Sequence, residues 1–189
     1  MCHAFLADST FHDLLFRFDQ DLAASVQAQG CRCGGVLHSA RYPRKPRGVP
    51  RPVLGPAYET RLSFCCAEDG CRRRTTPPSV RFLGRRVYLA AVVVLASVMV
   101  CGLTAKRLAQ LQDRFQVSVR TLRRWRQWWQ TAFVGSAFWR HAQGRLRPPV
   151  DVVDLPASLL NRFTAEDEPS KLVQLLCFLS PLSMASCVG

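Results

Sequence analysis

The stretch of residues 104–129, TAKRLAQLQDRFQVSVRTLRRWRQWW, constrains the fold of this chain more than any other. Leu108, Leu111 and Phe115 recur at helical spacing, and the pattern stops just before Ser118. Serine often caps the first turn of a helix, because its hydroxyl accepts a hydrogen bond from a free backbone amide. The stretch therefore predicts two short helices joined by a tight turn.

The second of these helices has two chemically different faces. At about 100° per residue, Leu122, Trp125 and Trp129 fall on one side of it. The other side is rich in guanidinium groups, which suit the phosphate lattice of DNA. We expect the DNA contacts of this helix to be Arg120, Thr121, Arg123, Arg124 and Gln127. The alternative is an amphipathic helix whose charged face is only solvated.

The same residues resemble a family pattern. The run from Leu111 to Ser118, followed by TLRRW at 121–125, is similar to the helix-turn-helix of bacterial transposases and recombinase-like DNA-binding proteins. The resemblance implies that the second helix recognises DNA. Two positions depart from the pattern, since Gln112 replaces a small alanine and Gln116 replaces the glycine of the turn. Gln is costlier than Gly in a left-handed conformation, so we expect a less sharp turn.

The net charge of +13 is concentrated in the middle of the chain. Residues 31–147 contain 23 basic and four acidic residues, whereas both flanking segments are net acidic. Such a concentration favours a polyphosphate partner and nearly excludes a basic substrate. RNA or an anionic membrane surface would be attracted by the same field, so charge alone does not separate these partners.

The chain contains nine cysteines. Its start lacks the basic segment of a secretion signal and has aspartate among its apolar residues, so we expect a cytoplasmic, nucleoid-associated protein. Cysteines that are not exported are reduced thiols or metal ligands more often than disulfides. The cysteine spacing therefore has to be compared with that of metal sites.

Two short cysteine motifs have the pattern of metal-binding knuckles. Cys31 and Cys33 are separated by one residue and followed by two glycines, and Cys66 and Cys71 form a second pair with a glycine directly before Cys71. A tetrahedral Zn²⁺ takes four soft ligands from two such turns, and two β-hairpins that each supply a pair form a zinc ribbon. We predict that these four cysteines bind a structural zinc ion.

Other ligand sets remain open at this site. Cys65 could replace Cys66, and His38 is an outside candidate. Both knuckles differ from the usual two-residue gap, and the alternative is a set of small buried or merely reduced cysteines. The scarcity of apolar residues in this segment favours the metal, because a structural zinc contributes on the order of 10 kcal/mol or more to folding.

Basic residues lie close to the second knuckle and between the two. In a folded ribbon they would be phosphate contacts: Arg44, Lys45, Arg72, Arg73 and Arg74. Either run could also be a solvated loop. Cysteine knuckles with an arginine cluster resemble the zinc ribbons that precede helix-turn-helix domains in mobile-element proteins, and the resemblance implies DNA binding by this segment as well.

The apolar run of residues 87–103 has no charge and is flanked by basic residues. Its 17 residues are at the lower limit for crossing a bilayer. Its alanine, serine and glycine residues allow close packing on all sides, so we expect a central buried helix that supports the helix-turn-helix. The alternative is a membrane span, which would make the protein a membrane-anchored regulator.

Further helices are expected at both ends of the chain. An amphipathic helix opens at Ser9 or Thr10 and ends before Gly30, because its apolar residues recur at helical spacing. The acidic tail contains two short apolar helices, around Ala157–Phe163 and Ser170–Leu179. We expect these terminal helices to pack on the rest of the chain, to join two copies into a homodimer, or to bind a partner.

Together the patterns predict a mainly α fold with a small β zinc-ribbon, and a helical bundle that contains the helix-turn-helix. The expected parts are an N-terminal helix over residues 1–30, a basic ribbon over 31–80, a helix-turn-helix domain over 81–147 and a helical tail over 148–189.

The sequence contains no recognisable catalytic constellation. Metal-dependent strand transfer requires carboxylates that a sheet brings together from separate segments, but the acidic residues of the tail lie close together in sequence. The sequence also contains no Gly-rich phosphate loop. From the resemblance we expect a DNA-binding protein of a mobile element, acting as accessory factor or DNA-binding part beside a transposase catalytic subunit. A transcriptional regulator unrelated to transposition is the alternative.

Overall fold

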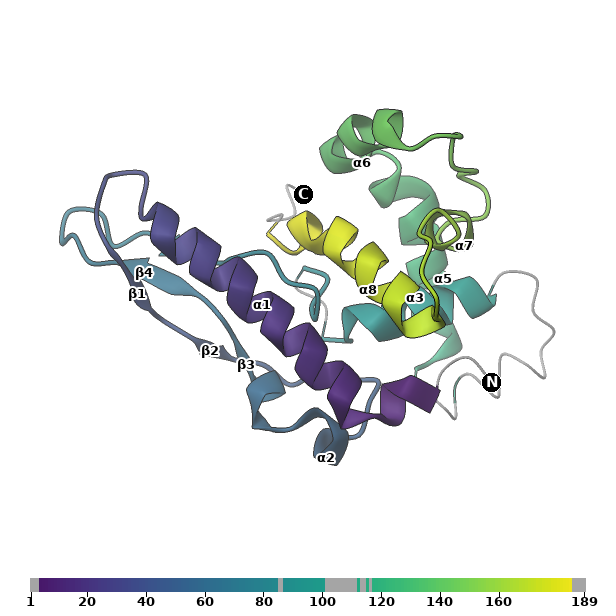
Figure 1. The fold of residues 1–189 in the computed structure, drawn as a ribbon, viewed down its shortest axis with the longest axis horizontal. Helices are drawn as coiled ribbons and strands as arrows, with labels where there is room; N and C mark the ends of the chain where they lie inside the picture. The colour runs from purple at the N-terminus through teal and green to yellow at the C-terminus, as the bar shows by residue number, and fades with distance from the viewer. Residues whose placement is uncertain (1–3, 85–86, 101–111, 113–114, 116, 185–189) are drawn as a thin grey trace. The chain divides into compact units, whose positions relative to one another are not determined.

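The computed structural model describes residues 4–84, 87–100, 112, 115 and 117–184 (Figure 1). The fold is mainly α-helical with a small amount of antiparallel β-structure. Its contacts divide the chain into two compact units, Met1–Leu89 with Cys177–Gly189, and Ala90–Leu176. The N-terminal helix and the cysteine-rich segment, expected as separate parts, thus belong to one unit, because the helix packs on the strands.

The first unit combines one long helix with short strands. Its regular elements are a 3-10 turn at Ala4–Ala7, α1 at Ser9–Gln29, β1 at Leu37–Ser39, β2 at Tyr42–Pro43, α2 at Arg51–Leu54, a 3-10 turn at Pro56–Glu59, β3 at Thr60–Arg61, β4 at Phe64–Cys66, β5 at Arg74–Thr75 and a 3-10 turn at Ser180–Ser183. The antiparallel strands form one sheet in the order β1-β4-β5 and a second pair, β2-β3. Helix α1 runs alongside these strands (Figure 1).

The long helix α1 agrees with the range that the sequence predicts. Asp8 caps it, because the Asp8 carboxylate accepts a hydrogen bond from the Thr10 amide at 2.9 Å. It ends at Gly30, whose φ of 69° is one that glycine adopts without strain. Ala23 on this helix belongs to the same buried apolar cluster as Leu37 of β1, which fixes the helix on the sheet.

A buried carboxylate links α1 to two later segments of the same unit. Asp19 accepts hydrogen bonds from the Ser79 hydroxyl at 2.6 Å and from the Val80 amide at 2.7 Å. Its Oδ2 also lies 2.7 Å from Nε of Arg81 and 3.9 Å from Nη1 of Arg61. All three charged side chains are almost completely buried, so two guanidinium groups share one carboxylate out of water.

Aromatic rings surround the Arg81 guanidinium group. Its Cζ lies 4.7 Å from the ring centroid of Phe16, 4.8 Å from that of Tyr58 and 5.1 Å from that of Phe82. Its Nη1 donates a hydrogen bond to the Ala57 carbonyl at 2.9 Å. A desolvated cation over an aromatic face is stabilised by about 2 kcal/mol, so the rings offset part of the cost of burying this charge.

The second unit is helical in its described part. Its elements are α3 at Ala90–Val100, α5 at Val119–Trp128, a π-helical turn at Trp129–Phe133, α6 at Ala137–Ala142, a 3-10 turn at Gln143–Arg145, α7 at Ala157–Leu160 and α8 at Glu168–Leu179, whose last residues belong to the first unit. Both helices predicted in the acidic tail are present as α7 and α8. Most of the first helix of the predicted helix-turn-helix, and the turn residue Gln116, lie outside the described residues.

The apolar helix α3 begins at Ala90, three residues later than the uncharged run of the sequence. Residues 90–97 are all buried, as expected of a helix that is packed on all sides. Among the residues that the structure describes, no helix combines the length and the apolar character that crossing a membrane requires.

Behind α5, aromatic side chains fill the core of the second unit. The ring centroid of Phe133 lies 4.8 Å from that of Trp129 and 4.9 Å from that of Trp139, and all three side chains are fully buried. Such pairs add about 0.5–1.5 kcal/mol beyond the burial of their area. These rings therefore form a rigid support for the helix in front of them.

We expect Asp19→Asn to lower the free energy of unfolding by about 3–5 kcal/mol, because it leaves two buried guanidinium groups without their counter-charge. Asp21→Asn is the matched control, since Asp21 lies on the same helix with an exposed side chain. Denaturant unfolding of both variants measures the difference. Equal losses in the two variants would show that the buried carboxylate does not stabilise the first unit.

Candidate metal centre and nucleic-acid interface

Four cysteines that are far apart in sequence converge in the first unit. The sulfur atoms of Cys31, Cys33, Cys66 and Cys71 all lie within 4.8 Å of one another. Sγ of Cys31 is 3.7 Å from Sγ of Cys71, and Sγ of Cys33 is 3.5 Å from Sγ of Cys66. This is the set of four thiols that the sequence predicts, and it could hold a metal ion.

The first pair of cysteines lies on a tight turn between α1 and β1. The amide of Cys31 donates to the Gly35 carbonyl at 2.9 Å, and the amide of Gly34 donates to the Cys31 carbonyl at 2.8 Å. Gly34 has a φ of 88°, which a residue with a side chain rarely adopts. The expectation of two hairpins is therefore met only in part, because a helix, not a strand, leads into this first knuckle.

The second pair lies on the hairpin between β4 and β5. Cys66 is the last residue of β4, and its amide donates to the Arg73 carbonyl at 3.0 Å. The chain turns through Glu68, whose carbonyl accepts a hydrogen bond from the amide of Cys71 at 3.0 Å. The strand register of β1 and β4 sets Leu37 opposite Cys66, which aligns the second knuckle with the first.

Gly35 of the first knuckle lies close to the side chains of the second knuckle. A Cβ atom on this residue would lie 2.9 Å from Sγ of Cys66 and 2.5 Å from Cγ of Glu68. No real Cβ contact is that short, so a side chain at position 35 would displace a ligand. The glycines that follow the first cysteine pair therefore have separate roles, one in the turn and one in packing.

The structure distinguishes between the adjacent candidates Cys65 and Cys66. Side chains of consecutive strand residues point to opposite faces of a sheet, so only one of the two can face the other thiols. Cys66 does so, whereas the Cys65 thiol contacts the Arg72 carbonyl at 3.5 Å. His38 lies opposite Cys65 in the register, is exposed, and is not part of the thiol cluster.

Backbone amides point toward the sulfur atoms of this cluster. Hydrogen bonds from the backbone amide and side chain of Cys33 lower the pKa of Cys31 to about 7. The Glu68 amide likewise bonds to the sulfur of Cys66, but burial and the other thiols raise the pKa of Cys66 to about 12. Amides two residues after a cysteine stabilise a thiolate, and crowded thiolates repel each other unless a cation binds them.

The dimensions of the cluster suit a tetrahedral metal site. Zinc–sulfur bonds of about 2.3 Å place four thiolates roughly 3.8 Å apart. The Cys33–Cys66 and Cys31–Cys71 sulfur pairs, at 3.5 and 3.7 Å, are close to this value, and all four sulfur atoms lie within 4.8 Å of one another. Cys31 and Cys66 are also part of a small apolar core that includes Phe64, so the site is anchored on the side that faces α1.

Helix α5 carries the second candidate site. The Ser118 hydroxyl caps it by accepting a hydrogen bond from the Thr121 amide at 3.3 Å, as the sequence predicts. Leu122, Trp125 and Trp129 are buried, with exposed fractions of 1, 4 and 0%. The residues that we call the basic face of α5 are exposed: Arg120, Arg123, Arg124 and Gln127. Arg126, which sequence reasoning did not select, is exposed on the same helix.

Two of the predicted DNA contacts are placed differently from the rest. Thr121 is buried, and its hydroxyl lies 3.0 Å from the Ser118 hydroxyl, so it belongs to the helix cap. Arg44 is half-buried and donates a hydrogen bond to the Gly84 carbonyl at 3.0 Å, with its guanidinium group 5.5 Å from the ring centroid of Phe82. Both side chains have structural contacts that local sequence patterns do not reveal.

The predicted contacts near the second knuckle are exposed. Arg72 pairs with the carboxylate of Asp69 in the hairpin, whereas Arg73 and Arg74 form no ion pair with any residue that the structure describes. Lys45 is also exposed. The hairpin therefore presents exposed positive charge at Arg73 and Arg74, two and three residues after the last cysteine of the cluster.

Comparison with protein-family models, curated proteins and solved structures gives no match for this chain. Its function therefore has to be inferred from the geometry of these two sites.

We expect the purified protein to bind one cobalt(II) ion per chain in place of zinc, with the absorption of tetrahedral thiolate coordination. Cys33→Ser removes one of the four converging thiols and should abolish that absorption. Cys65→Ser is the matched control, since this neighbouring thiol lies outside the cluster, and it should leave the spectrum unchanged. A spectrum abolished in both variants, or in neither, would contradict the assignment of ligands.

Gly35→Ala should weaken metal binding by at least about tenfold, because the new methyl group would displace the sulfur of Cys66 or the Glu68 side chain. Gly70→Ala is the control, since a Cβ there would meet nothing within 4 Å. Competition with a chelator of known affinity gives both values. Equal affinity in the two variants would show that the knuckles do not approach each other at Gly35.

Proposed function

We propose that this chain is a DNA-binding protein that contacts DNA through the basic face of α5 and contains a structural zinc ion. The observation that carries the proposal is the pairing of two faces on one helix. Arg120, Arg123 and Arg124 are exposed, while the indole rings beneath them are buried in an aromatic core. Rigid helices with arginine on the outer face suit both phosphate contacts and the edges of bases in the major groove.

The arginines of α5 are available for a partner. None of them forms an ion pair with a carboxylate in the part of the chain that the structure describes. Exposed guanidinium groups this close together repel one another, and a polyanion that displaces its counterions relieves the repulsion. The formal charge of +13 supports the same class of partner.

Zinc is the metal that best fits the thiol cluster. Four thiolates in tetrahedral proximity form a closed site without an open position for substrate, which is typical of structural zinc. When bound, the ion would supply folding free energy to a segment whose apolar core is small. Cys31, Cys33, Cys66 and Cys71 would hold it, and we propose no reaction at this centre.

The role of this protein in a mobile element is a proposal that rests on the sequence resemblance. It would act as the accessory or DNA-binding part of a transposase, with the catalytic subunit as partner, and the terminal helices would provide contacts for a second copy. The DNA-binding proposal is independent of that role, because it depends only on the chemistry of α5.

We expect Arg123→Ala combined with Arg124→Ala to weaken duplex DNA binding and to reduce the slope of log K against log salt by about 0.9 for each phosphate that the variant no longer neutralises. Arg17→Ala combined with Arg140→Ala is the matched control, because it removes the same charge from exposed positions on α1 and α6. Fluorescence anisotropy of a labelled duplex over a range of salt concentrations measures both.

The control should keep the wild-type slope. If the α5 variant and the control lose the same affinity, binding depends only on net charge and the basic face of α5 has no particular role. If the wild-type protein does not bind duplex DNA at all, the proposed function is wrong.

A further inference from the structure

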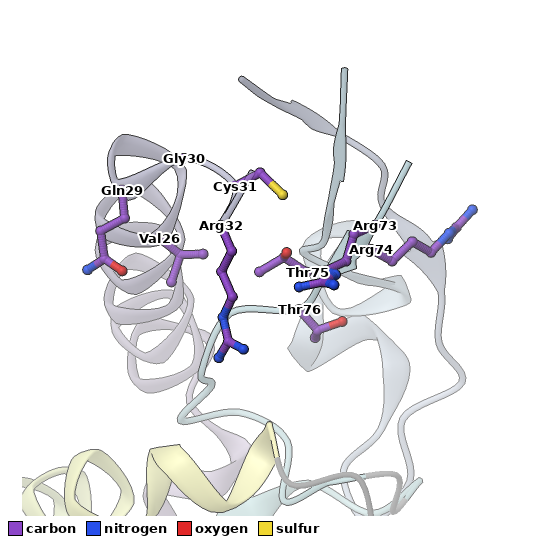
Figure 2. Close-up of a pocket in the computed structure, with 9 residues that line it drawn as sticks. All are labelled: Val26, Gln29, Gly30, Cys31, Arg32, Arg73, Arg74, Thr75 and Thr76. Carbon is purple, nitrogen blue, oxygen red and sulfur yellow. The ribbon is translucent and has the colours of Figure 1, made fainter. Parts of the chain in front are cut away.

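An open hollow of about 360 Å³ lies next to the thiol cluster. One wall is formed by the end of α1 and the first knuckle, and the other by residues 73–76, which include β5. Cys31 belongs both to the thiol cluster and to the lining of the hollow. Figure 2 shows the Arg32 side chain extending between α1 and the segment of Thr75 and Thr76.

The polar side chains of this lining suit an oxyanion. No aspartate or glutamate is among the lining residues. Figure 2 shows the guanidinium groups of Arg32 and Arg73 on the side of the hollow, whereas the side chains of Gln29 and Arg74 extend away from it. Thr75 and Thr76 add hydroxyl groups to the lining. Arg32 and Arg73 form no ion pair with any described carboxylate. Guanidinium groups bind phosphate oxygens with two parallel hydrogen bonds, and hydroxyl groups can complete the shell of such an anion.

Neutralising the metal centre is a second role that the same arginines could have. Four thiolates around a divalent cation carry two net negative charges, which the guanidinium groups of Arg32 and Arg73 would balance. The neighbouring Arg72 already pairs with Asp69. Metal affinity and phosphate response therefore have to be measured on the same variants.

The thiol cluster controls the distance between the two walls of the hollow. Arg32 lies between Cys31 and Cys33, and Arg73 follows Cys71 by two residues. The Arg73 carbonyl also accepts a hydrogen bond from the Cys66 amide at 3.0 Å. A cation bound to all four thiolates would therefore fix the arginines of one wall relative to those of the other, which lowers the entropy cost of binding an anion between them.

We propose that this hollow is a phosphate-binding site assembled by the metal centre, and that a backbone phosphate of DNA occupies it. The statement that the phosphate belongs to DNA rests on the proposed function. The statement that the hollow binds phosphate does not, because free inorganic phosphate would be bound by the same side chains. The experiment therefore uses both probes with the metal-loaded full chain.

The first probe is inorganic phosphate, added at constant ionic strength with chloride as the balancing anion. Phosphate should raise the midpoint of thermal unfolding in a saturable way, because it binds the folded state. Arg32→Ala combined with Arg73→Ala should weaken this binding by more than about tenfold, because it removes charge-assisted hydrogen-bond donors from both walls of the hollow. Arg17→Ala combined with Arg140→Ala is the control, and it should respond like the wild type.

The second probe is a labelled DNA duplex, measured over a range of salt concentrations. The Arg32 and Arg73 double variant should show a salt slope reduced by about 0.9, as expected when one phosphate is no longer neutralised. A slope that does not change, together with an abolished response to inorganic phosphate, would overturn DNA as the source. If neither the wild-type protein nor any variant binds the duplex, the proposed function fails. The measurement with inorganic phosphate then decides by itself whether the hollow binds phosphate.

The metal content and the chelator-competition affinity of each variant complete the test. If the double variant responds normally to phosphate but binds cobalt(II) more weakly, the arginines neutralise the metal centre and the phosphate site is wrong. If it keeps wild-type metal affinity and no longer responds to phosphate, the inference is supported. A wild-type protein with no phosphate response overturns it.

Discussion

The convergence of four thiols is the constraint on which the cysteine-rich part of the first unit depends. Strands of two or three residues provide few backbone hydrogen bonds, and the apolar cluster beneath them is small. Without a further cross-link the turn after α1 and the β4-β5 hairpin would have little to hold them together. Sulfur atoms within 4.8 Å of one another provide that link once a cation binds them. The hollow beside them depends on the same link, because its arginines lie next to the ligands in sequence.

A second interaction, around the buried carboxylate of Asp19, links α1 to the segment that follows β5. Asp19 holds the guanidinium group of Arg81 and approaches that of Arg61, and aromatic rings cover the charges. Buried charge networks add little net stability but impose a high cost on any other arrangement. The network therefore determines where the segment after β5 runs, and the apolar contacts of Ala23 determine where the helix meets the sheet.

The two candidate sites differ in what each requires from the chain. The basic face of α5 follows from one helix and from the aromatic residues that support it. The metal centre requires two segments more than thirty residues apart in sequence to meet with their thiols on the same side. In the function that we propose, a zinc ion would supply rigidity to a weakly packed segment, and the arginines of α5 would supply affinity for a polyanion.

Local sequence patterns determined the extent of α1, the Ser118 cap and the two faces of α5, because capping residues mark the ends of a helix and helical spacing fixes the direction of each side chain. Cysteine spacing identified the thiols that come together. Only the tertiary structure decided that Cys66 and not Cys65 faces the cluster, because the strand register sets which face a residue occupies. It also buried Asp19 and placed Arg32 opposite Arg73. These outcomes depend on contacts between distant segments, which no local pattern encodes.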